Sequence, residues 1–217
     1  MYRVGIIDDE DSVVSDYRLK FKNYNRRNRL NDNEKFELIK IDLDKDHTKI
    51  INNTIDKRVE CLLIDNKIIP KEGANFTGAQ LLKEFNKKIN DLPCIILTSW
   101  IDDARSSELV VKPLIFDKEI MMKEIESEDF RTFMDTIEHS IKVFRKRTSL
   151  NLIEYKNLKE KNDNNNLTAE EYQVMIDDYR ILSSYGYTED IPPELLNIQI
   201  NSKLDDIING IESLLEE

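Results

Sequence analysis

The sequence predicts an α/β fold with a five-stranded parallel sheet, followed by an all-α helical extension. Three observations lead to this prediction. Short apolar runs alternate with helix-like patterns within the first 145 residues, polar residues stand directly after most of these runs, and only helical patterns follow. Such alternation favours a parallel sheet with helices on both of its faces, the doubly wound arrangement.

A buried parallel strand is typically a continuous apolar run. Runs of this kind predict strands over residues 3–7, 36–43, 61–64, 94–97 and 114–116. Between them, apolar residues at intervals of three and four predict helices. These helices are expected over residues 12–24, 46–57 and 79–88.

The remaining third of the chain reads as helical. Apolar residues recur from Phe130 to Phe144, and the pattern persists through Leu158. A capping box, Thr168 with Glu171, starts the next helix. Two further apolar stripes follow, formed by Tyr172, Met175, Tyr179 and Leu182, and by Ile200, Leu204, Ile207, Ile208, Ile211 and Leu215.

These patterns divide the chain into a first domain, 1–145, and a helical extension, 146–217. We expect the extension to be a coiled coil or a helical hairpin. Two or three helices alone bury little apolar surface, so the extension is expected to need a protein partner or a second copy of the chain as a homodimer.

Charge argues against nucleic acid as the partner. The whole chain has a net charge of −11. Between Ser149 and Glu217 there are 5 Lys or Arg and 15 Asp or Glu, which leaves −10. A DNA-reading helix needs cations for the phosphates, so we expect no DNA binding. The short basic run 145–147 is read as a solvated helix face.

The same composition predicts a cytoplasmic protein. The sequence has no run of about 18 apolar residues that could span a membrane and no export signal at its start. Two cysteines do not make a disulfide framework. Cys61 and Cys94 each precede a strand-end polar residue by four positions, so we expect two reduced core thiols on one face of the sheet.

Polar residues at the strand ends are the candidate site. In doubly wound sheets the site lies beyond the carboxyl ends of the strands. The residues there are Asp8, Asp9, Asp65, Thr98 and Lys118. Converging carboxylates repel one another, and a hard divalent cation such as Mg²⁺ relieves that repulsion. A carboxylate can then attack a phosphoryl group, whose charge the lysine and hydroxyl neutralise.

This pattern resembles the receiver domain of two-component response regulators. The resemblance covers about residues 2–145 and includes Gly78, which matches the glycine that opens the third helix. It implies a flavodoxin-like sheet of order 2-1-3-4-5 and an acceptor at Asp65. It also implies Mg²⁺ held by Asp9, Asp65 and the backbone carbonyl of Lys67, with Asp8 acting through water.

The resemblance further implies that Thr98 and Lys118 contact the phosphoryl oxygens. Lys118 is followed by Glu119 where the family commonly has proline, and the Lys112–Pro113 pair offers an alternative, Lys112, as the site lysine.

Three further features depart from the family pattern. The segment 66–77 is long, and the segment between Thr98 and Lys118 is short for a full fourth helix. The position of the family's aromatic switch residue holds Ile115, while Phe116 should point to the other face because strand side chains alternate.

The leading hypothesis is a signalling protein rather than an enzyme, with at most self-catalysed phosphoryl transfer to Asp65 and its hydrolysis. A histidine kinase or another phosphodonor would supply the group, and the extension would contact a protein effector. The alternative is a phosphorylation-independent, receiver-like adaptor subunit. A phosphatase with an aspartate nucleophile is disfavoured, because it needs an acid where Lys67 stands.

Overall fold

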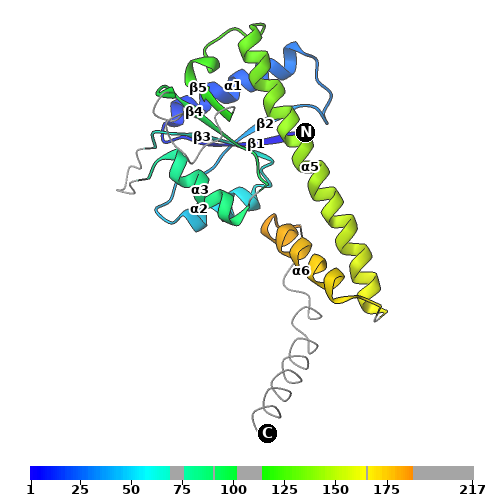
Figure 1. The fold of residues 1–217 in the computed structure, drawn as a ribbon. Helices are drawn as coiled ribbons and strands as arrows, with labels where there is room; N and C mark the ends of the chain where they lie inside the picture. Colours follow the sequence, from blue (N-terminus) through cyan, green and yellow to red (C-terminus); the bar gives the residue numbers. More distant parts are fainter. Residues whose placement is uncertain (69–75, 90, 102–113, 165, 188–217) are drawn as a thin grey trace, which may run out of the picture.

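The computed structural model describes residues 1–68, 76–89, 91–101, 114–164 and 166–187. Its sheet is five-stranded and parallel, with the order β2-β1-β3-β4-β5, which confirms the predicted fold (Figure 1). The strands are β1 (Tyr2–Ile7), β2 (Phe36–Lys40), β3 (Cys61–Asp65), β4 (Cys94–Thr98) and β5 (Ile115–Asp117).

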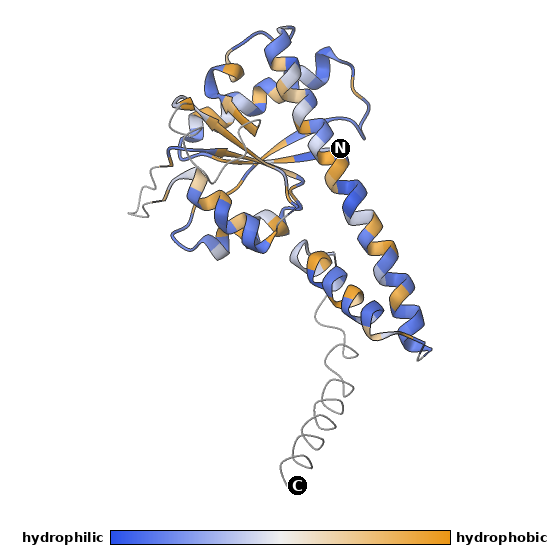
Figure 2. Cartoon of the chain, viewed as in Figure 1, coloured by the Kyte–Doolittle hydropathy of each residue, from blue (hydrophilic) through white to orange (hydrophobic). Residues whose placement is uncertain are grey.

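Helices cover both faces of the sheet. The helix α1 (Asp11–Arg27) and the first half of α5 (Glu128–Asp163) pack on one face. The helices α2 (His47–Asp56) and α3 (Gly78–Lys88) pack on the other. Figure 2 shows the hydrophobic strands lying between these two layers of helices. The burial of both sheet faces explains why the strands read as continuous apolar runs.

The predicted strand over 36–43 is too long. β2 ends at Lys40, and beyond it Ile41 donates one further hydrogen bond to the carbonyl of Ile6 at 2.9 Å. The chain then turns toward Asp46, whose side chain accepts a hydrogen bond from the backbone N–H of Thr48 and caps α2. Residues 42–46, three of which are aspartates, therefore form a connection instead of extending the strand.

Capping boxes fix the starts of two helices. Thr77 with Gln80 caps α3, and Thr168 with Glu171 caps α6 (Ala169–Ser184), as predicted for the second. In each box the threonine side chain accepts from the third helical N–H, while the longer side chain accepts from the cap residue. A short 3₁₀ helix, η2 (Lys118–Met121), follows β5.

The C-terminal part described is a helical hairpin. The helix α5 runs unbroken through residue 145 and on to Asp163, and α6 packs back along its second half (Figure 1). None of the helices that the structure describes combines the length and apolar character needed to cross a bilayer. The last predicted stripe, from Ile200 to Leu215, lies outside the described residues. The hairpin core consists of Tyr155, Leu158, Met175, Tyr179 and Leu182.

Several side-chain contacts, including an ion pair of Arg147 with Asp91 at 3.2 Å, hold the hairpin to the body. Arg145 donates hydrogen bonds to both carboxylate oxygens of Glu60, at 2.6 and 2.8 Å. Beyond α6, the ring of Tyr185 meets that of Phe144 edge-on, with centroids 5.0 Å apart. Gly186 follows with φ +68°, a conformation that glycine adopts without strain. These contacts lie at the end of the sheet opposite to the candidate site, because Glu60 precedes β3 and Asp91 precedes β4.

Both cysteines are buried and free, as expected, but the prediction that they share a face is wrong. Cys94 pairs in register with Leu62, one residue beyond Cys61. Since strand side chains alternate, Cys61 packs toward α1 and α5, and Cys94 toward α2 and α3. Equal spacing to two strand-end residues did not fix the register between the strands.

Burial makes both thiols poor nucleophiles. Loss of solvation raises the pKa of Cys94 to about 12 and that of Cys61 well above its ordinary value. We therefore expect no fast reaction of the folded protein with a chromogenic disulfide reagent at pH 8, and reaction of both thiols in denaturant. A thiol that reacts fast in the folded state would contradict this burial.

Candidate functional site

Three carboxylates meet where the first and third strands end. Asp8 and Asp9 follow β1, and Asp65 is the last residue of β3, its neighbour in the sheet. One oxygen from each carboxylate lies within 4.8 Å of the others. Asp8 is only 1% exposed and Asp65 only 7% exposed. The sequence prediction that these acids converge is therefore confirmed in the geometry.

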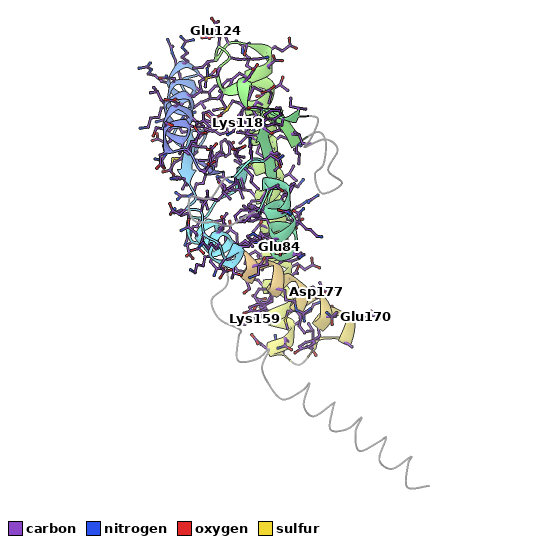
Figure 3. The ribbon with its side chains drawn as sticks, turned by 90° about the vertical axis from the view of Figure 1, so that its left-hand side faces the viewer. Glu84, Lys118, Glu124, Lys159, Glu170 and Asp177 are labelled. Carbon is purple, nitrogen blue, oxygen red and sulfur yellow. The ribbon has the colours of Figure 1, made fainter. Side chains whose placement is uncertain are left out.

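A single ammonium group bridges two of these acids. The Nζ of Lys118 lies 2.7 Å from Asp65 Oδ2 and 2.9 Å from Asp8 Oδ2. Lys118 starts η2 directly after β5, so the end of the edge strand points its side chain back over the site. Figure 3 shows Lys118 within the body, well away from Asp177 on the hairpin.

The pKa shifts describe a buried ion pair. Burial raises the pKa of Asp65, and the hydrogen bond from Lys118 opposes this effect without cancelling it. Burial lowers the pKa of Lys118, but its hydrogen bonds to Asp65 and Asp8 outweigh burial and raise it overall. The lysine is therefore charged at neutral pH and compensates part of the negative charge of the cluster.

Further polar groups lie at the ends of the third and fourth strands, which are neighbours in the sheet. Thr98 is 1% exposed, and its Oγ1 accepts a hydrogen bond from the backbone N–H of Trp100 at 3.0 Å. Lys67 donates its backbone N–H to Asp65 Oδ1 at 3.2 Å, and its ammonium lies 5.6 Å from the ring centre of Trp100.

The exposed Trp100 was not singled out by the sequence analysis. Its position two residues after Thr98 was the only available signal. The partner Lys67 lies in another loop, so their contact was not visible in the sequence.

The helix α3 is packed tightly against the end of β3. The backbone N–H of Gly78 donates to the carbonyl of Asn66 at 3.0 Å, and the Asn66 side chain accepts from the N–H of Ala79. A Cβ on Gly78 would lie 2.3 Å from the backbone oxygen of Asp65. The glycine at the start of α3 is thus required by close backbone approach.

The donor set fits Mg²⁺. Carboxylate and carbonyl oxygens are the hard ligands that Mg²⁺ accepts in proteins, together with several waters. The cluster supplies three carboxylates on two adjacent strand ends, and its buried negative charge exceeds the single positive charge of Lys118. A divalent cation would balance this excess.

The remaining sequence expectations concern the edge of the sheet. Phe116 packs edge-on against Phe133 of α5, with centroids 5.2 Å apart, while Ile115 is buried on the other face. The predicted opposite orientation of these two residues is confirmed. The alternative lysine, Lys112, and most of the shortened segment before it lie outside the described residues, as does much of the loop 66–77.

No family model matches the chain, and no curated protein matches it significantly. Among solved structures, it is similar to the Thermotoga maritima response regulator TrrA in complex with Mg(2+)-BeF. That match has 14% identity, a TM-score of 0.40, and covers 64% of this chain and 99% of the other.

A second match is the Salmonella typhimurium response regulator RcsB, with 16% identity and a TM-score of 0.46, over 89% of this chain and 96% of the other. The assignment of the fold therefore rests on this chain's own sheet, which is parallel and has the order β2-β1-β3-β4-β5.

Proposed function

We propose that this chain is a receiver-like signalling protein that is phosphorylated on Asp65 in the presence of Mg²⁺. The observation that carries the proposal is the cluster of buried Asp8 and Asp65 with half-buried Asp9, in which the ammonium of Lys118 lies 2.7 Å from the Asp65 carboxylate. A structural ion pair would need one acid for one lysine. Three acids around one lysine leave negative charge that a metal-dependent phosphoryl transfer requires.

In this proposal Asp9, Asp65 and the backbone carbonyl of Lys67 hold Mg²⁺, and Asp8 acts through a water molecule. When bound, the metal neutralises charge on the phosphoryl oxygens. Thr98 and Lys118 contact the same oxygens through the hydroxyl and the ammonium. The short distance from Lys118 to Asp65 supports its role, because the ammonium already lies beside the reacting carboxylate.

The reaction is a direct displacement at phosphorus. A carboxylate oxygen of Asp65 attacks the phosphorus atom of a phosphohistidine or a small acyl phosphate, and a new O–P bond forms. The bond from phosphorus to the donor nitrogen or oxygen breaks, and the donor retains that electron pair. Hydrolysis by water later returns the free carboxylate. Beyond these self-catalysed steps we propose no enzymatic activity.

The output in this proposal is a protein contact. The net charge of −10 from Ser149 to Glu217 favours a protein effector over DNA. The effector would bind the helical extension, 146–217, which forms a unit separate from the receiver-like part, 1–145, in this proposal. A second copy of the chain is the other candidate partner. The reduced, buried thiols agree with a cytoplasmic protein.

A second candidate function is supported by one observation. Ile115 occupies the place of the family's switch aromatic, and Phe116 is packed against Phe133 on the opposite face. A receiver-like scaffold without that switch would suit a phosphorylation-independent adaptor subunit. The two candidates differ in whether the acidic cluster binds Mg²⁺ and a phosphoryl mimic.

Thermal unfolding with Mg²⁺ and beryllofluoride separates these candidates. We expect the two together to raise the unfolding midpoint by roughly 5–10 °C, because a ligand at a hundredfold excess over its Kd stabilises by about 2.7 kcal/mol. EDTA should reverse the shift, Asp65→Asn should abolish it, and the exposed Asp16→Asn should retain it. A folded wild-type protein without any shift would favour the adaptor.

A further inference from the structure

The hairpin leaves one of its sides open. Leu150 and Glu154 of α5 are four residues apart and share a helix face, as do Val174, Asp178 and Ile181 of α6. The rings of Tyr155 and Tyr179, the residues next to Glu154 and Asp178, lie 6.0 Å apart, so the two faces stand at the same level of the hairpin. We define the hairpin flank as Leu150, Glu154, Val174, Asp178 and Ile181. Leu150 is 56% exposed and Val174 is 40% exposed, so the flank has uncovered apolar surface.

A buried acid lies within this flank. Asp178 is 7% exposed, and its Oδ2 has no hydrogen-bond partner among the described residues. Burial and the nearby acids Glu154 and Asp177 raise the pKa of Asp178 to about 6. A buried carboxylate is stable in a fold when a cation or donor compensates it. A segment that binds to the flank must therefore cover its apolar side chains and bring a positive charge beside Asp178.

The sequence that follows the described hairpin carries both. Apolar residues recur at intervals of three and four from Ile200 to Leu215. Lys203 is the only Lys or Arg after Arg180. It follows Ile200 by three residues and precedes Ile207 by four, so a helix over this segment would place it among the apolar side chains.

The length and the position of the segment 200–215 also suit the flank. The helix α6 has 16 residues, as many as the segment 200–215, and each would be about 24 Å long as a helix. Tyr185, just after α6, packs on Phe144 at the body end of the hairpin. From Tyr187 onward, residues 188–199 are enough chain to turn back toward the flank.

We propose that residues 200–215 form a third helix that packs on the hairpin flank of their own chain. This helix covers Leu150 and Val174 and places the ammonium of Lys203 beside Asp178. The extension would then be a three-helix unit with its own core, attached to the receiver-like body through Arg145 and Tyr185.

Cross-linking in the full chain tests the proposed contact. Val174→Cys with Ile207→Cys is treated with a short bismaleimide, to which the buried native thiols are unreactive. The control pairs Ile207→Cys with Gln173→Cys, an exposed position turned about 100° around α6. We expect cross-linked monomer, formed at least about tenfold faster than in the control. Equal rates, or cross-linked dimers in place of monomers, would overturn the proposal.

The charge contact has a separate readout. Asp178→Asn is made in the wild type and in a Lys203→Met background, and hydrogen exchange is measured for the amides of α6. If Lys203 compensates Asp178, Asp178→Asn lowers their protection by about tenfold in the wild type and does not lower it in the Lys203→Met chain, where the buried carboxylate is already uncompensated. Unchanged or higher protection in the wild type would contradict the contact.

Discussion

Lys118→Met is expected to lower the free energy of unfolding of the Mg²⁺-free protein by about 3 kcal/mol, because removing one partner from a buried ion pair leaves uncompensated charge. The two acids it contacts, Asp8 and Asp65, are almost fully buried. The same change should increase Mg²⁺ affinity by roughly tenfold, since the ammonium competes with the metal for these carboxylates. Urea unfolding with and without Mg²⁺ measures both effects.

The matched control for this variant is Lys123→Met. Lys123 forms an exposed ion pair with Asp129 a few residues along the chain, and such surface pairs contribute little to stability. Its removal should leave both urea unfolding and Mg²⁺ affinity close to wild type. If Lys118→Met behaves in the same way, Lys118 does not compensate the acidic cluster.

Gly78→Ala is expected to destabilise the protein by about 3 kcal/mol or more. The added Cβ would lie 2.3 Å from the backbone oxygen of Asp65 and 2.8 Å from the Cα of Asn66. Neither backbone atom can rotate away, so α3 must shift from the end of β3. That shift would also displace the Asp65 carboxylate, and we expect Mg²⁺ binding to weaken together with stability.

Chemical denaturation of Gly78→Ala tests this packing directly. Asn86→Ala, on the exposed side of the same helix, is the control and should change stability by no more than about 0.5 kcal/mol. A Gly78→Ala protein as stable as wild type would mean that α3 can move away from the end of β3 without loss of stability.

The fold and most of the candidate site were predictable because their signals are local. Each buried strand is an apolar run, and the topology of a parallel sheet brings the residues that follow these runs to one edge. That reasoning identified Asp8, Asp9, Asp65 and Lys118 before any geometry was known, and the structure places them together.

Contacts between distant parts of the chain were not predictable in the same way. The ion pair of Arg145 with Glu60 and the ring contact of Tyr185 with Phe144 join segments whose own patterns are complete without them. The strand register could not be predicted for the same reason. Because Leu62 and not Cys61 lies opposite Cys94, the two cysteines point to opposite faces of the sheet. No spacing within a single strand records that offset.

Phosphorylation of the acceptor is the central claim, and intact mass spectrometry tests it most directly. The full chain is incubated with acetyl phosphate with and without Mg²⁺, beside Asp65→Asn and the exposed control Asp16→Asn. We predict an adduct of one phosphoryl group, about 80 Da, that requires Mg²⁺, persists in Asp16→Asn and is absent from Asp65→Asn. A folded wild-type protein without the adduct, or an adduct that survives in Asp65→Asn, would contradict the assignment of Asp65 as acceptor.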